Sequence, residues 1–125
     1  MPPRIAPLQP EDRAAWEVLA RGYKEFYNTP TTDAEYTTAW NRLLAQDGVY
    51  GLAAFVDKGL VGIAHYLFHT GIWASTNCYL QDLFTAPQAR GTGVARALIE
   101  AVAAQARSRA RPVQQGRQAQ RVHPL

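Results

Sequence analysis

The stretch from Leu80 to Val102, LQDLFTAPQARGTGVARALIEAV, constrains the fold of this chain more than any other segment. It runs from an apolar segment through Pro87 to two glycines, Gly91 and Gly93, and then into an apolar pattern with helical spacing. Glycine weakens a helix interior, so a pair of glycines at such a junction indicates a turn whose backbone must stay bare. The pattern predicts a strand, a tight loop and then a helix over about residues 91–107.

The loop before this helix is chemically suited to an anion. The first turn of a helix has four N–H groups without internal partners, and the helix dipole makes that end positive. An anion placed there accepts several hydrogen bonds, and Arg90 and Arg96 add positive charge. The dinucleotide pattern fails because Arg96 stands where a third glycine is required, and the P-loop pattern fails because no Lys-Ser/Thr pair follows. Glycine spacing alone leaves a phosphate site and a purely structural turn both open.

Two helices are predicted upstream of this stretch. The first covers about residues 10–28, where an apolar stripe at helical spacing is formed by Ala15, Leu19, Tyr23 and Phe26, with Trp16 and Tyr27 beside them. The second begins near Thr32, because Thr32 and Glu35 have the spacing of a capping box, in which each side chain bonds the other's free backbone N–H.

Three strands complete the expected elements. The segments VYGLAAFV and LVGIAHYLFH predict a hairpin whose short turn, Asp57-Lys58-Gly59, is expected to use Gly59 for a positive φ. CYLQDLFT predicts a third strand that leads into the glycine loop. No internal repeat is visible, and the mixture of helices with a hairpin indicates the α+β class.

This arrangement resembles the acetyl-coenzyme A motif of the GNAT superfamily of N-acetyltransferases. In that motif a strand and a short loop lead to Arg/Gln-x-x-Gly-x-Gly/Ala at the start of a helix, and Gln88, Gly91 and Gly93 match the three defined positions. The upstream order of two helices, a hairpin and a motif strand fits as well, so the resemblance covers about residues 3–107. It implies a GNAT-like α+β fold with a central, mostly antiparallel sheet flanked by helices.

The resemblance implies acetyl-CoA as co-substrate. Its pantetheine arm would pair with the backbone at the end of the motif strand, at Leu83, Phe84 and Thr85. Its pyrophosphate would be held by the backbone of the loop and helix start, with arginine charge nearby, at Arg90, Gly91, Thr92, Gly93, Val94, Ala95 and Arg96.

The resemblance also implies direct attack of a neutral amine on the thioester, with a carboxylate near the motif strand as the base. Asp82 is the candidate; strand alternation places it on one face with Leu80 and Phe84, and a structural role remains the alternative. The acceptor is expected to be a primary amine of a small molecule, of the diamine or amino-acid type, or of a peptide.

Tyr27 and His65 are the candidate substrate-binding residues, with His65 acting as a pocket residue or as a base. Tyr23, Tyr36 and Trp40 could line the acceptor site as well. The alternative for His65 is a hydrogen-bonded histidine with a structural role in the sheet. The alternative for the aromatic residues is that they belong to the hydrophobic core, as aromatic residues at helical spacing usually do. No metal site is expected, because His65, His69 and Cys78 offer too few ligands.

Composition bounds the partners. The net charge of +3 conceals an uneven distribution: residues 105–125 carry five arginines and no acidic residue, so the rest of the chain is at −2. Arginines attract phosphates without sequence preference, yet no aromatic residue lies among these to stack on bases, so nucleic acid is not expected as a partner. A single cysteine fits a reducing compartment, and no apolar run reaches the roughly 20 residues of a membrane span. We expect a cytoplasmic protein without a membrane partner, and a homodimer stays open.

After Arg107 the apolar periodicity stops. The GNAT superfamily normally continues with further strands and a helix that often brings a tyrosine as general acid, whereas this chain has no Tyr, Trp or Phe after Phe84. We therefore expect an incomplete acetyltransferase domain over residues 1–107 and a basic, disordered tail over residues 108–125, from a truncated or frameshifted gene or a short form completed by a partner chain. Part of the apolar stripe of the last helix would then face water. A non-catalytic remnant that binds CoA weakly or not at all is the alternative function.

Overall fold

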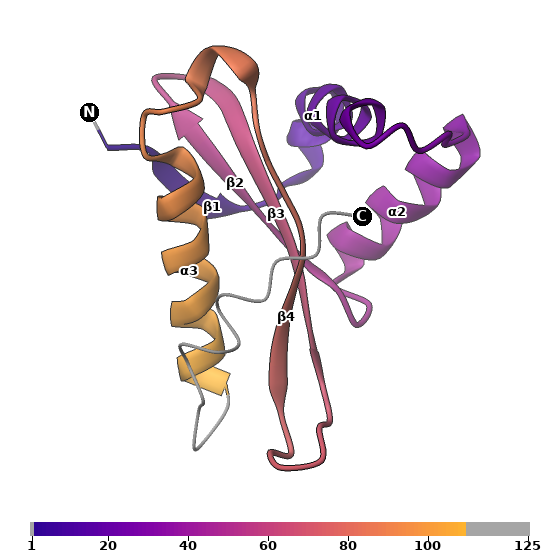
Figure 1. Cartoon of the computed structure of the whole chain (residues 1–125). Helices are drawn as coiled ribbons and strands as arrows, with labels where there is room; N and C mark the ends of the chain where they lie inside the picture. The colour runs from indigo at the N-terminus through magenta and orange to yellow at the C-terminus, as the bar shows by residue number, and fades with distance from the viewer. Residues whose placement is uncertain (1, 110–125) are drawn as a thin grey trace.

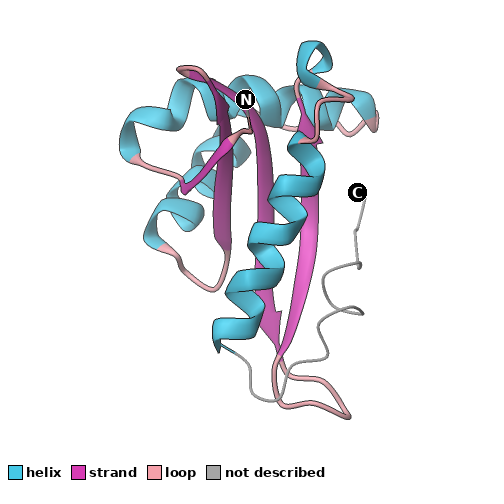
Figure 2. Ribbon diagram, turned by 90° about the vertical axis from the view of Figure 1, so that its left-hand side faces the viewer, coloured by secondary structure: helices cyan, strands magenta, loops and turns pink. Residues whose placement is uncertain are grey.

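The computed structural model describes residues 2–109 of the chain, with a four-stranded sheet between two layers of helices (Figure 1). The strands follow the order β1-β2-β3-β4, and every neighbouring pair is antiparallel. Helices α1 and α2 cover one face of the sheet and α3 covers the other (Figures 1 and 2). The expected α+β fold with an antiparallel sheet flanked by helices is confirmed. The expected disordered tail lies, from residue 110 onward, outside the described residues.

Three of the strands match the sequence prediction. They are β2 (Tyr50–Val56), β3 (Gly59–His69) and β4 (Asn77–Thr85). The sequence did not predict β1 (Arg4–Pro7), which has four residues and pairs along the edge of β2. In the hairpin turn the positive φ belongs to Asp57, at 57°, and not to Gly59 as expected. Gly59 already begins β3, and aspartate is among the residues that adopt the left-handed region most readily.

The helices are α1 (Arg13–Phe26), which follows a short 3-10 turn, α2 (Asp33–Ala45) and α3 (Val94–Arg109). The predicted capping box of α2 is confirmed, because the Thr32 N–H donates to Glu35 Oε1 at 2.8 Å and the Glu35 N–H donates to Thr32 Oγ1 at 3.1 Å. The predicted stripe of α1 was half wrong: Ala15 and Phe26 are exposed. The buried face of α1 consists instead of Trp16, Leu19, Ala20 and Tyr23. The Trp16 ring lies at its centre and packs on Trp40.

Two hydrophobic clusters lie on opposite faces of the sheet. The first packs α1 and α2 against side chains such as Ile63 and Phe84. The second packs α3 against β2, β3 and β4. Part of the apolar stripe of α3, which consists of Val94, Leu98, Ile99 and Val102, was expected to face water. Three of these residues are at most 2% exposed, and only Ile99 is partly buried. The helix approaches the sheet closely at Gly62, where a Cβ atom would lie 2.7 Å from Val94 Cγ1.

A β-bulge in β4 decides which side chains share a face. His65 pairs with Asp82, but its neighbour Tyr66 pairs with Leu80, so Gln81 is an extra residue in β4. Leu80 therefore packs in the cluster under α3, whereas Asp82 faces the side of α1 and α2. Strand alternation alone had placed Leu80 and Asp82 on the same face, which the bulge makes wrong.

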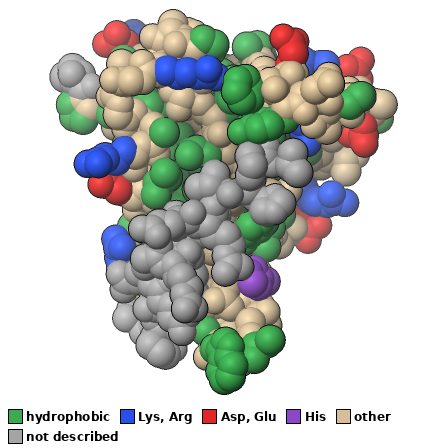
Figure 3. Space-filling view, viewed as in Figure 1, with side chains coloured by type: hydrophobic (Ala, Val, Ile, Leu, Met, Phe, Trp, Pro, Cys, Tyr) green, Lys and Arg blue, Asp and Glu red, His purple; other side chains and the backbone are tan. Residues whose placement is uncertain are grey.

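The longest strands, β3 and β4, project beyond the helices as a long hairpin (Figure 1). Hydrophobic side chains gather at its tip (Figure 3), where Ile72 and Trp73 are 90% and 88% exposed.

Candidate active site

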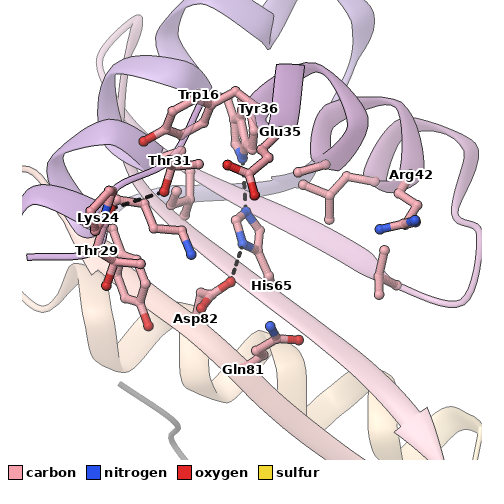
Figure 4. Close-up of a pocket in the computed structure, with 17 residues that line it drawn as sticks. Trp16, Lys24, Thr29, Thr31, Glu35, Tyr36, Arg42, His65, Gln81 and Asp82 are labelled. Carbon is pink, nitrogen blue, oxygen red and sulfur yellow. Dashed lines mark hydrogen bonds and ion pairs between the residues drawn. The ribbon is translucent and has the colours of Figure 1, made fainter. Parts of the chain in front are cut away.

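Three side chains from α1, β3 and β4 form a hydrogen-bonded chain on the α1/α2 face of the sheet (Figure 4). The Trp16 indole N–H donates to His65 Nε2 at 2.9 Å, and His65 Nδ1 lies 2.9 Å from Asp82 Oδ2. An indole nitrogen can only donate, so His65 Nε2 must be the acceptor and carries no proton in this arrangement. The imidazole proton therefore lies on Nδ1 and is donated to the carboxylate.

The carboxylate of Asp82 is held in its charged form. Burial by itself would raise the pKa of Asp82, but hydrogen bonding and charge interaction with His65, with smaller contributions from Tyr23 and Lys24, outweigh it, so the pKa lies below its usual value. The Asp82 side chain is 16% exposed, and Oδ1 is buried without a partner at hydrogen-bonding geometry among the described residues. Burial and then the Asp82 charge raise the pKa of the neighbouring Tyr23, which stays neutral.

This chain of side chains borders a cavity of about 370 Å³ between α1, α2 and the sheet (Figure 4). His65, Tyr23 and Tyr36 line it, whereas Tyr27 is not among its lining residues and packs on the ring of Tyr23 at 5.0 Å. Sequence reasoning missed the charged and indole groups at its border, which are Trp16, Lys24, Glu35 and Arg42. These residues come from α1 and α2. No local sequence motif indicates which face of each helix packs on the sheet, so their position at the cavity could not be predicted.

The predicted anion loop follows β4 directly. A 3-10 turn over Pro87–Ala89 leads to Gly91 and Gly93, whose φ angles are 79° and 89°. At these angles a side chain would be strained, and a Cβ atom built on either glycine meets no protein atom within 4 Å. The backbone here is therefore bare and borders open space, so the loop fits the pyrophosphate expected from the sequence.

Backbone donors converge at the same place. The first bond of α3 runs from the Ala97 N–H to Gly93 O at 3.0 Å, so the N–H groups of Val94, Ala95 and Arg96 have no acceptor within the helix. The Val94 side chain is buried under the helix, so only the backbone N–H of this residue can contact a ligand at the loop. The Arg90 N–H is already paired, with Pro87 O at 3.3 Å, and the Thr92 hydroxyl donates to Ala89 O.

The free edge of β4 leads toward these donors. β4 has a strand partner on one side only among residues 2–109. The Ala86 N–H donates to Val61 O, and antiparallel alternation then directs the backbone groups of Leu83 and Thr85 outward and those of Phe84 toward β3. Thr85 O accepts a bond from Arg90 Nε at 3.1 Å, and the Arg90 guanidinium lies over the Phe84 ring.

The comparisons with known proteins agree with this arrangement. The model of the acetyltransferase (GNAT) family matches residues 13–123, and the chain belongs to this family. The D-amino-acid N-acetyltransferase HPA3 of Saccharomyces cerevisiae is 33% identical over 102 residues, which are 78% of this chain and 63% of that protein. The chain thus spans less than two thirds of the length of this curated relative.

Solved structures share the fold. The ribosomal-protein-alanine N-acetyltransferase from Brucella melitensis biovar Abortus 2308 has a TM-score of 0.75 at 23% identity, covering 90% of this chain and 78% of that one. The aminoglycoside N-acetyltransferase AAC(6')-Iy, in complex with CoA, has a TM-score of 0.74 at 21% identity, covering 89% and 74%. At these identities the likeness concerns the fold alone.

Within residues 2–109 no helix is both long and apolar enough to pass through a membrane. Nor does that part of the chain bring together three or more His, Cys, Asp or Glu side chains as a metal ion requires.

Proposed function

We propose that this protein transfers the acetyl group of acetyl-CoA to a primary amine of a small molecule. The observation that carries the proposal is the course of β4. Within a few residues this strand passes from Asp82, at the border of the cavity, to the outward-facing backbone of Thr85, and then to the bare loop at Gly91 and Gly93. One strand thus connects a site for an amine with a site for a pyrophosphate.

On the CoA side, the chain offers backbone groups. The N–H groups of Val94, Ala95 and Arg96, together with the loop glycines, would hold the pyrophosphate, and the helix dipole favours its charge. The outward-facing groups of Leu83 and Thr85 would bind the pantetheine arm as an added strand does. Bound acetyl-CoA supplies an acetyl group activated as a thioester.

On the acceptor side, Asp82 is the catalytic candidate. A protonated amine enters a cavity whose border carries this ionised carboxylate, and gives up one proton to it directly or through water. The neutral nitrogen then forms a bond to the acetyl carbon and the carbon–sulfur bond breaks. The nitrogen gives up a second proton as the amide forms, the sulfur takes up one proton, directly or through water, and coenzyme A leaves as the thiol, while the proton on Asp82 returns to solvent. His65 holds Asp82 and borders the acceptor.

The size of the cavity and the known relatives support a small acceptor. A volume of about 370 Å³ lies in the range of small-molecule sites. The yeast relative is named for D-amino acids, which favours the amino-acid type of acceptor over the diamine type. Lys24 and Arg42 border the same cavity and add positive charge suited to a carboxylate.

The test is thiol release from acetyl-CoA with a panel of amines that includes D-alanine, L-alanine, putrescine and an aminoglycoside. Amine-dependent release, with the N-acetylated product found by mass spectrometry, supports the proposal. Calorimetric CoA binding without release for any amine would favour the alternative, a non-catalytic remnant. If neither CoA binding nor thiol release is detected, the proposed CoA site is refuted.

A further inference from the structure

We propose that Trp16 and His65 are positioning residues that fix the Asp82 carboxylate, with Oδ2 bound to His65, so that the carboxylate is held in place for the ammonium group of the acceptor. This inference rests on the proposed function, because it assigns the way in which the same site holds its amine. It adds a residue of α1, 49 positions away from His65 in sequence, to the machinery of the site.

The donor at the start of this chain is fixed by the core. Trp16 is 1% exposed and packs against Trp40, with 5.1 Å between the ring centroids. Its N–H therefore has one direction, toward His65 Nε2. The His65 and Asp82 side chains are 15% and 16% exposed, so they lie at the boundary between this core and the cavity.

The direction of the bonds decides what each group can do. While Trp16 donates to Nε2, His65 cannot take a proton there, so it cannot serve as the base of the reaction through that nitrogen. Its other nitrogen carries the proton and donates it to Asp82 Oδ2, so that nitrogen cannot accept a proton from the amine either. What remains for the amine is the Asp82 carboxylate, which is 16% exposed at the border of the cavity and which His65 and Tyr23 hold from the protein side.

The orientation of His65 affects the charge of Asp82. The charged and titratable groups that line the cavity with Asp82 are Tyr23 and Lys24 from α1, Glu35, Tyr36 and Arg42 from α2, and His65 from β3, and those that act on its charge are His65, Tyr23 and Lys24. Burial disfavours the Asp82 charge, and His65 makes the largest opposing contribution, so loss of the His65 bond would raise the pKa of the carboxylate. A carboxylate that binds an ammonium group must stay ionised. We expect the His65 hydrogen bond to keep Asp82 ionised as long as the bond from Trp16 fixes the orientation of the imidazole.

The first experiment needs no activity. Proton–nitrogen correlation NMR identifies the protonated nitrogen of His65, assigned with the help of His65→Asn. The proposal expects the proton on Nδ1 in the unaltered protein, and a shift toward the Nε2 form in Trp16→Phe, which loses the N–H but keeps an aromatic ring. Trp40→Phe is the matched control, since it alters the same cluster without touching His65. A proton on Nε2 in the unaltered protein would overturn the proposal.

The second experiment follows Asp82 itself. Carbon NMR of its carboxyl group is expected to show titration at higher pH in His65→Leu, an intermediate change in Trp16→Phe, and none in Trp40→Phe. His65→Asn keeps an N–H near the Nδ1 position and should restore much of the low titration. Equal titration in all four variants would show that His65 and Trp16 are only packing residues.

Kinetics separates this proposal from the proposed function. With an acceptor from the active panel, Trp16→Phe should lower kcat/KM for the amine by up to about tenfold, the upper end of the range for one lost hydrogen bond between uncharged groups, and move the acidic limb of its pH profile upward. The KM for acetyl-CoA should not change. A protein without transferase activity that still shows the Nδ1 form and the shifted Asp82 titration would refute the function and leave the positioning intact.

Discussion

The imidazole of His65 and the carboxylate of Asp82, 17 residues apart in sequence, lie opposite each other on β3 and β4 with Nδ1 and Oδ2 separated by 2.9 Å. Their contact depends on the bulge at Gln81. Without that extra residue Asp82 would share the face of Leu80 and point toward α3, into an apolar cluster. A single irregularity in β4 thus gives the acceptor cavity its carboxylate.

Replacing the carboxylate should slow acetyl transfer in a pH-dependent way. Asp82→Asn removes the charge that receives the ammonium group, so kcat/KM for the amine should fall at neutral pH by about 10²-fold, within the usual range for an acid–base group. Above about pH 10 most primary amine is already neutral, and the deficit should shrink there. Initial rates between pH 6 and about pH 11 measure both effects.

Asp57→Asn is the matched control for this change. Asp57 is an exposed aspartate in the hairpin turn with a φ of 57°, which asparagine tolerates, so rates should stay unchanged. Full activity of Asp82→Asn at every pH would remove Asp82 from the mechanism.

The loop glycines should matter for CoA rather than for the fold. Gly91→Val or Gly93→Val places a side chain in the open space beside the helix start, and CoA affinity should fall by at least about tenfold, or 1.4 kcal/mol. Both changes also add strain of roughly 1–2 kcal/mol because φ is positive. Calorimetric titration with CoA and a thermal melt separate loss of binding from loss of stability.

Gly48→Val controls for that strain. Gly48 has a φ of 77° and equally open surroundings, but follows α2 and lies outside the loop. It should lose stability like the loop variants and keep its CoA affinity. Equal affinity in all three variants would show that the glycines serve the turn alone.

Much of the fold could be predicted because its signals are local. The capping box at Thr32 and Glu35, and the apolar spacing of Val94, Leu98 and Val102, lie within one or two helical turns. The match of Gln88, Gly91 and Gly93 to a known motif likewise requires six consecutive residues. Such patterns are visible in a single sequence because each is satisfied by its own neighbours.

The site could be predicted only in part, because its other members meet through pairing and packing. Strand β1 has no signal of its own, and the bulge is a property of two strands together. The bond from Trp16 to His65 requires α1 to lie across the sheet at one particular place. The same packing excludes Tyr27 from the cavity, because its ring lies against Tyr23.

Lys24 should distinguish acceptors that carry a carboxylate from those that do not. It borders the cavity and its charge lowers the pKa of Asp82, so a zwitterionic acceptor would meet opposite charges at its two ends. Lys24→Met keeps most of the side-chain volume and should raise KM for D-alanine by about tenfold, the value of one charge-assisted hydrogen bond, with little change for putrescine. An equal change in KM for D-alanine and putrescine would mean that Lys24 does not bind the carboxylate of the acceptor.

Cys78 should make stability fall at alkaline pH. Its thiol is 2% exposed, and burial raises its pKa from 9.0 to about 11, with the Arg109 charge opposing in part. Because the folded-state pKa is the higher one, the contribution of the neutral thiol is complete below pH 9 and is lost as the pH rises toward 11. Its size is on the order of 1–3 kcal/mol.

Urea unfolding at a series of pH values across that interval measures the effect, with Cys78→Ala as the comparison. The loss of unfolding free energy should be shallower in Cys78→Ala, and Tyr66, whose pKa burial raises to about 12, accounts for part of what remains in both proteins. The same burial predicts that an aromatic disulfide reagent labels Cys78 at pH 8 only as fast as the protein opens. Immediate labelling of the folded protein, or identical pH dependence in the two proteins, would show that Cys78 reaches solvent and that the packing of α3 on the sheet is looser than described.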